Sequence, residues 1–206
     1  MKHTICMAFA LVALAASSRA EIRFGGGVQG GLAISAFGSS SKFYGLGFGG
    51  GAHGDLRIID ELTVRINVDY NAFPSDKDKV HDLFVVTDPF GRPVPFEVSG
   101  GNRTIVTIEL NGIGKIPTHS AVTPYGILGF GLNIGSVSDI KVAARGETIS
   151  TVPTPSADTR FGLNFGAGSE FNVSRWSRLF FDVKYVLIFT GDGTVAYVPF
   201  TVGWSF

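Results

Sequence analysis

The final residues of the sequence, Val195-Ala196-Tyr197-Val198-Pro199-Phe200-Thr201-Val202-Gly203-Trp204-Ser205-Phe206, decide the fold. Counted back from the end in twos, one face carries only apolar side chains: Val198, Phe200, Val202, Trp204 and Phe206. Because side chains alternate between the two faces of a β-strand, this stretch is predicted to be a strand with one apolar face. A lipid bilayer covers such a face without a second layer of protein.

The same alternation recurs through the rest of the sequence. It is clearest between Leu62 and Asn71, where apolar residues alternate with Thr63, Arg65 and Asp69. Charged side chains at every other position of an apolar strand fit a barrel with a polar interior better than a soluble sandwich. The predicted strands run over about 22–35, 44–58, 62–71, 106–115, 128–134, 160–171, 178–189 and 195–206.

An alternating last strand that ends in Phe resembles the closing strand of outer-membrane β-barrels, nearest to the eight-stranded OmpA/OmpX-like barrels. The resemblance implies an all-β fold, a transmembrane antiparallel up-and-down β-barrel of eight strands in one domain, residues 21–206. It also implies that this strand is both the membrane anchor and the signal read by the barrel-assembly machinery, through Phe200, Val202, Trp204 and Phe206. The expected partners are therefore outer-membrane lipid and, during biogenesis, that machinery.

Two connections between predicted strands are long, residues 72–102 and 136–158, and both are expected outside the membrane on one side of the barrel. In the first, Asp88-Pro89-Phe90-Gly91 has the residues of a type I turn, so 80–86 and 94–98 are predicted to form a small hairpin. Each segment is shorter than the roughly 9–11 residues of a spanning strand, which favours eight strands and leaves ten as an alternative. The sequence does not indicate what these loops bind.

Residues 1–20 have the pattern of a secretory signal peptide. A basic start precedes an apolar run from Ile5 to Ala16, and Ser18-Arg19-Ala20 places small residues where a signal peptidase reads them, so cleavage is predicted after Ala20. The chain is therefore expected to be exported and to reside in the cell outer membrane. The single cysteine, Cys6, lies in this segment, so no disulfide is expected in the mature chain.

Charge and composition exclude several classes of function. The sequence holds 17 basic and 17 acidic residues; without the signal segment, 15 basic and 17 acidic residues remain, a net charge of −2. A nucleic-acid-binding protein would carry a basic excess, so no nucleic-acid partner is expected. Asp76, Asp78 and Asp82 lack the spacing of a metal-binding loop, and the glycine runs lack the context of a phosphate loop, so no metal and no cofactor is predicted.

The polar faces of the predicted strands supply the candidate functional residues. An eight-stranded barrel is just wide enough for side chains to fill it, and opposite charges confined there are expected to pair, because unpaired buried charge is costly. The many inward glycines allow two interpretations, a cavity that conducts or room for large inward side chains such as Tyr125, Phe180 and Tyr197. We predict a polar network in the lumen formed by Arg57, Arg65, Asp69, Glu109, Arg160, Glu170, Asp182 and Lys184.

Four functions are consistent with this pattern. We favour a non-enzymatic barrel with a side-chain-filled polar lumen, acting as an envelope-structural or surface-contact protein through its loops. One alternative is a narrow pore for small solutes. Another is a lipid-modifying barrel enzyme, which requires a His beside a Ser or Asp; the candidates are His53, His81 and His119. The last is a soluble periplasmic lipocalin-like ligand binder, in which the apolar faces would line a pocket and the charged faces would meet water.

Overall fold

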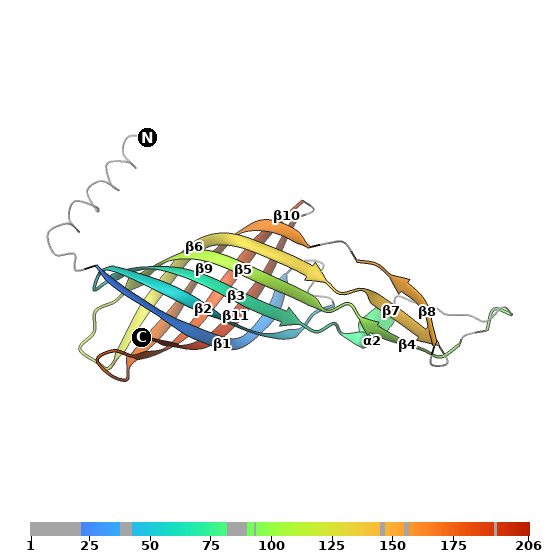
Figure 1. Ribbon diagram of the computed structural model, residues 1–206, viewed down its shortest axis with the longest axis horizontal. Helices are drawn as coiled ribbons and strands as arrows, with labels where there is room; N and C mark the ends of the chain where they lie inside the picture. The colour runs from blue at the N-terminus through green and yellow to red at the C-terminus, as the bar shows by residue number, and fades with distance from the viewer. Residues whose placement is uncertain are drawn as a thin grey trace.

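Eight antiparallel strands close into a barrel (Figure 1). The computed structural model describes residues 22–37, 43–81, 90–92, 94–144, 147–154, 157–191 and 193–206. The barrel order β1-β11-β10-β9-β6-β5-β3-β2 confirms the predicted eight-stranded up-and-down topology. The predicted signal peptide and its cleavage site at Ala20 lie outside the described residues. The barrel strands are β1 (Arg23–Phe37), β2 (Leu46–Ile59), β3 (Leu62–Phe73), β5 (Arg103–Lys115), β6 (Val122–Val137), β9 (Asp158–Asn172), β10 (Arg178–Thr190) and β11 (Gly193–Ser205).

The first and last strands close the barrel. β1 and β11 pair antiparallel in an unbroken register from Gly27 opposite Ser205 to Ser35 opposite Tyr197. Past the end of β11, the Phe206 amide donates to the Gly26 carbonyl at 2.8 Å, and the Gly26 amide donates to the Phe206 carbonyl at 3.0 Å. Closure of this kind leaves no row of unpaired backbone groups facing lipid.

Pro199 distorts the sheet, as expected for a residue that cannot donate a backbone hydrogen bond. β10 pairs with β11 at Val183 opposite Phe200 and again at Val186 opposite Tyr197, in an unchanged register, but the two intervening positions are unpaired. On its other side, Pro199 pairs with Ala33 in an unbroken register, and β1 shifts register only farther along, between Ser35 and Phe37. The distortion is therefore absorbed locally, and the barrel still closes.

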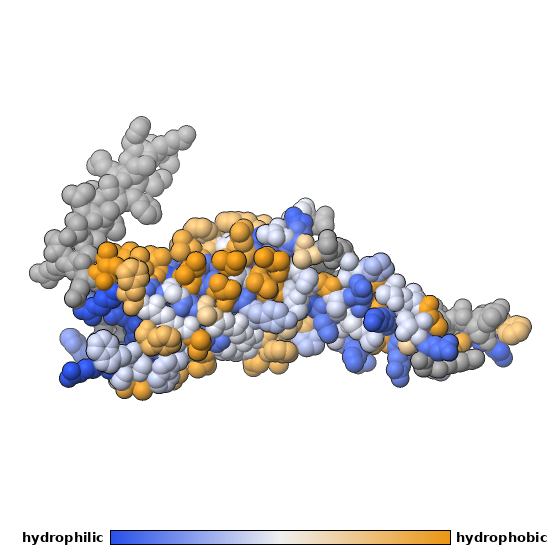
Figure 2. All heavy atoms as spheres, viewed as in Figure 1, coloured by the Kyte–Doolittle hydropathy of each residue, from blue (hydrophilic) through white to orange (hydrophobic). Residues whose placement is uncertain are grey.

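The apolar faces of the strands point outward and the charged faces point inward. Ile66, Leu128 and Phe130 expose between 50% and 71% of their surface, whereas Lys184 is only 5% exposed. Figure 2 shows apolar residues gathered over the visible face of the barrel, whereas the part beyond the loop end is mostly hydrophilic. This orientation is the reverse of a lipocalin-like pocket, so the soluble ligand-binder alternative is wrong.

β1 begins and β11 ends at the same end of the barrel, which we call the terminal end; the opposite end is the loop end. The connections at the terminal end are short, and the longest spans residues 116–121. At the loop end, 74–102 and 138–157 are long, whereas β10 and β11 are joined by residues 191–192 alone. This asymmetry between the two ends matches the predicted loop lengths.

Beyond the loop end, the two long connections build a second, three-stranded sheet (Figure 1). Its order is β4 (Phe96–Gly100), β7 (Ile140–Ala144) and β8 (Glu147–Val152). Gly100 and Gly101 have positive φ angles of 85° and 72°, a backbone conformation that favours glycine, where the chain leaves β4 for the barrel. The carbonyl of Gly101 also accepts a hydrogen bond of 2.9 Å from the Tyr44 hydroxyl.

The predicted hairpin between 80–86 and 94–98 is wrong. Val80 lies in a short helix, α2 (Lys77–His81), residues 82–89 lie outside the described part of the chain, and β4 pairs with β7 from the other connection. A local turn signal could not reveal pairing between segments about 40 residues apart. Because these strands lie outside the barrel, the ten-stranded alternative is also wrong. Within the described residues, no helix has both the length and the apolar character needed to cross a membrane.

Inward glycines make room for large side chains on the neighbouring strands. A Cβ at Gly168 would lie 2.5 Å from the ring of Tyr125, and a Cβ at Gly203 would overlap the ring of Phe180. Both rings are buried, with exposures of 4% and 2%. Of the two interpretations of the inward glycines, a conducting cavity or room for large side chains, these contacts support the second.

Gly203→Ala is expected to lower the free energy of unfolding by about 1–3 kcal/mol, because the added carbon overpacks the lumen against Phe180. The measurement is a urea titration of the folded barrel in lipid vesicles. Gly126→Ala is the matched control, since its Cβ would meet nothing within 4 Å on the outer face. Equal stability of the two variants would contradict this account.

Candidate functional site: the filled lumen and its two ends

Lys184 of β10 centres one group of charges in the lumen. Its Nζ donates to Oε2 of Glu109 at 2.5 Å and lies 3.8 Å from Oδ2 of Asp69. Nε2 of Gln29 donates to Oδ1 of Asp69 at 2.5 Å. Glu109 and Lys184 expose only 3% and 5% of their surfaces, so this pair is held away from bulk water.

Arg65 of β3 centres a second group, nearer the terminal end. Its guanidinium donates two hydrogen bonds to the Asp55 carboxylate, of 2.6 and 3.0 Å, and Nη1 lies 3.8 Å from Oδ2 of Asp182. The Tyr125 hydroxyl donates to the same Asp182 carboxylate. The guanidinium also lies 4.8 Å from the centre of the Phe180 ring. A cation over the face of an aromatic ring is attracted to it, so Phe180 helps to hold Arg65 in the lumen.

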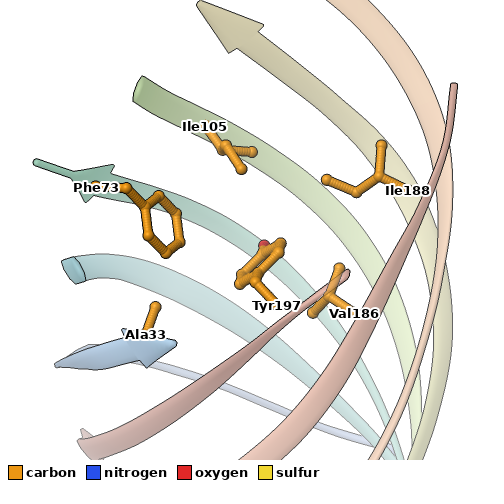
Figure 3. Packing of buried hydrophobic residues seen from close by; sticks show 6 residues of the cluster. All are labelled: Ala33, Phe73, Ile105, Val186, Ile188 and Tyr197. Carbon is orange, nitrogen blue, oxygen red and sulfur yellow. The ribbon is translucent and has the colours of Figure 1, made fainter. Parts of the chain in front are cut away.

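An apolar cluster fills the lumen at the loop end. Its side chains converge between the strands (Figure 3) and expose at most 3% of their surface: Ala33, Phe73, Ile105, Val186, Ile188 and Tyr197. Phe73 and Tyr197 meet edge to face with ring centres 5.8 Å apart. The Tyr197 hydroxyl lies 3.2 Å from the Thr107 hydroxyl, which donates to Asn133. Tyr197 was expected to face inward, but an apolar layer around it was not foreseen, because the predicted lumen network consisted of charged residues.

Charged residues return at the terminal end. Lys115 donates to both carboxylate oxygens of Glu170, at 2.9 and 2.8 Å, and Arg178 lies 3.6 Å from the same carboxylate. These residues border a cavity of about 640 Å³ that opens at this end. Lys115 was predicted only as the end of a strand, so its role in the lumen was missed.

The structure brings together some of the predicted lumen residues and separates others. Arg65, Asp69, Glu109, Asp182 and Lys184 lie in the two central groups. Glu170 and Arg57 lie at the terminal end beside the cavity. Arg160 lies apart from these groups, at the loop end, where its guanidinium contacts the half-exposed Asp158 at 2.5 Å. It occupies an inward position, but so close to the start of β9 that it emerges from the lumen.

The two larger cavities lie at opposite ends of the barrel. The cavity at the terminal end has about 640 Å³, and the cavity at the loop end, lined by Arg103, Arg160 and Ile188 among others, has about 170 Å³. Between them lie the apolar cluster, the Lys184 group and the Arg65 group. Within the described residues, side chains thus divide the lumen.

The histidines do not assemble a nucleophilic site among the described residues. Nε2 of His53 lies 3.0 Å from the Ser205 hydroxyl and 3.9 Å from Asp55, so both partners approach the same nitrogen. A catalytic triad needs the carboxylate on the other ring nitrogen. His81 stacks on Phe96 with ring centres 4.1 Å apart, and the next residue, Asp82, lies outside the described residues. His119 lies in an exposed turn at the terminal end. No group of His, Cys, Asp and Glu in the described part of the chain could hold a metal ion.

Comparison with known proteins agrees with this architecture. The family model for the outer membrane protein beta-barrel domain matches residues 4–206. The chain belongs to this family. It is therefore an integral outer-membrane β-barrel, with charged residues facing the lumen and apolar residues facing lipid.

Solved structures share the fold of this outer-membrane barrel at low sequence identity. Neisserial surface protein A (NspA) aligns with a TM-score of 0.53 and 21% identity, over 88% of this chain and 95% of that chain. A major outer membrane protein from Thermus thermophilus aligns with a TM-score of 0.50 and 12% identity, over 89% of this chain and 99% of that chain. None of the curated proteins matches the sequence.

Lys184→Met is expected to lower the free energy of unfolding by about 3–5 kcal/mol, because it leaves the buried Glu109 and Asp69 carboxylates without their cation. Urea titration in lipid vesicles measures the effect. The additional change Glu109→Gln should recover part of the loss. Arg160→Gln is the control: its pair with Asp158 is solvent-exposed, so less than about 1 kcal/mol is expected. A Lys184→Met barrel as stable as the parent would show that the pair contributes no net stability.

Proposed function

We propose that this outer-membrane barrel is a non-enzymatic surface-contact protein that acts through its loop sheet, defined as β4, β7 and β8 together. The lumen serves as a rigid, filled support. The exposed edge strand β8 carries this proposal, because it presents an ordered surface beyond the membrane. The supporting observations concern orientation, the loop sheet and the lumen.

The orientation follows from loop length. In outer-membrane barrels, short turns face the periplasm and longer loops face the outside. We therefore assign the terminal end of this barrel to the periplasm and the loop end to the cell exterior. The two long connections, which carry α2, β4, β7 and β8, then project from the cell surface.

The loop sheet is ordered, although no membrane requires it. β4 comes from one long connection, and β7 and β8 come from the other, so their pairing fixes the two loops to each other. All six residues of β8 are exposed, and Ile149 exposes 52% of its surface. An exposed edge strand offers unpaired backbone groups to another chain. These features support a role in contact with a partner at the cell surface.

The filled lumen argues for support and against conduction. Two charged groups and an apolar cluster lie between the end cavities, and their side chains are buried. Opening a path through them would separate buried ion pairs, which is costly.

Planar-bilayer recordings test the filled lumen directly. The purified barrel is expected to give no steady single-channel conductance at moderate voltage. The Lys184–Glu109 pair and the apolar cluster that contains Phe73 block the lumen. The control is a variant with Phe73→Ala and Lys184→Ala together, which removes side chains from both layers. Steady conductance from the unmodified barrel would instead establish the narrow-pore alternative.

Photo-crosslinking on intact cells tests surface contact. A photoreactive amino acid in place of Ile149 on β8 is expected to crosslink to a partner from outside the cell. The matched control is the same amino acid at Leu128, which is 71% exposed on the lipid face. The cells are irradiated in the presence of the surfaces and proteins that they meet in their habitat. If Ile149 then gives no adduct beyond those at Leu128, the surface-contact role fails.

Phe206→Ala is expected to reduce the amount of assembled protein in the outer membrane several-fold while changing the stability of the refolded barrel little. The Phe206 side chain is 68% exposed and the hydrogen bonds to Gly26 use only its backbone, so the finished barrel depends little on the ring. Phe24→Ala is the control, because Phe24 is 85% exposed near the same end but lies on the first strand. Normal outer-membrane levels of the Phe206→Ala protein would contradict the proposal that this residue is part of an assembly signal.

A further inference from the structure

The cavity at the terminal end carries features that the proposed surface-contact function does not use. Its volume of about 640 Å³ lies within the range of small-molecule binding sites, roughly 300–1,000 Å³. Five basic side chains line it: Arg23, Arg57, Lys115, Arg175 and Arg178. Four acidic side chains also line it: Asp55, Asp60, Glu61 and Glu170.

The inner acidic residues are already engaged by cations. Asp55 is bound by Arg65 from inside the lumen, and Glu170 accepts two hydrogen bonds from Lys115. Asp60 and Glu61 lie on the exposed two-residue turn between β2 and β3. Glu170 also engages Lys115 and Arg178, so among the basic lining residues these two already have a counter-charge within 4.0 Å. Arg57 is the basic residue of the inner wall that matters for a ligand.

Arg57 lies in an unusual position on the cavity wall. It is directly opposite Arg23 across the β1–β2 pair, and like charges in that arrangement destabilise a sheet. Arg57 forms no ion pair with a described residue within 4.0 Å. An anion in the cavity would supply Arg57 with a counter-charge.

Thr63 gives an independent indication of a ligand. It is directly opposite Arg57 across the β2–β3 pair, lines the same cavity and exposes only 3% of its surface. Its hydroxyl has no hydrogen-bond partner among the described residues. Buried polar groups are normally satisfied, so an unpartnered hydroxyl beside an arginine is suited to a ligand oxygen.

The rim of the cavity adds an apolar component. Phe24, Trp176 and Phe206 line it, and Trp176 exposes 84% of its surface. We infer that this cavity binds a small organic phosphate, whose phosphate oxygens contact Arg57 and Thr63 and whose organic part lies against Trp176. Guanidinium groups match the geometry of phosphate, and the cavity has room for more than the phosphate itself.

Fluorescence titration of the folded barrel in a non-ionic detergent tests this inference. Trp204→Phe leaves Trp176 as the only tryptophan, so its emission reports on the cavity. Saturable binding is expected for glycerol 3-phosphate or for short-chain phosphatidylglycerol, and not for glycerol. The two phosphates distinguish a free ligand from a lipid headgroup, and binding of either one supports the inference. Calorimetric titration with the same compounds detects binding that leaves the emission unchanged.

Variants locate the site. Arg57→Gln should weaken binding about tenfold or more through loss of a charged hydrogen bond, and Thr63→Val about fivefold. Arg160→Gln removes an arginine at the opposite end and should leave the affinity unchanged. Gel mobility with and without heating verifies that each variant is folded. If the Arg57→Gln or Thr63→Val barrel does not fold, Arg178→Gln is tested in its place. Absence of saturable binding to both phosphates, or equal binding by the Arg57→Gln and Arg160→Gln barrels, would overturn the inference.

Discussion

The structure depends on one constraint: in lipid, every backbone polar group must find its partner within the protein. The pairing of β1 with β11, and the two hydrogen bonds between Gly26 and Phe206, meet that constraint by removing the sheet edges. Closure with eight strands then fixes a narrow lumen. Inward side chains must share that small volume, and glycines such as Gly203 provide the space that Phe180 occupies.

The narrow lumen also determines how its charges are arranged. A lysine or arginine there cannot be fully hydrated, so each central cation contacts two carboxylates, Lys184 with Glu109 and Asp69, and Arg65 with Asp55 and Asp182. Uncharged donors, among them the Tyr125 hydroxyl, contribute further hydrogen bonds to these carboxylates. The filled centre separates the two ends, so chemistry at one end need not affect the other. This separation is consistent with the proposed contact surface outside and the proposed ligand site at the opposite end.

Much of the fold could be predicted from the sequence because a period of two residues assigns every side chain to a face. That rule placed Arg65, Glu109 and Lys184 inside and Phe130 outside. It could not identify partners, because Glu109 and Lys184 are 75 residues apart and meet only through the barrel's register. It also missed the apolar cluster around Phe73, since alternation assigns a face but not the chemistry of that face at each depth. The pairing of β4 with β7 was missed because it joins two separate connections.

The two ends of the lumen are filled by different kinds of side chain, and this explains why one end is closed and the other is open. At the loop end, the inward positions of β5 and β10 carry Ile105 and Ile188, which pack into the apolar cluster around Tyr197. At the terminal end the same two strands carry Lys115 and Arg178, whose long, charged side chains contact Glu170 but leave the cavity open. Apolar side chains fill space by packing, whereas charged ones require a counter-charge or water. The lumen is thus closed by packing at the loop end and left open at the terminal end, where we infer the phosphate site beside Arg57.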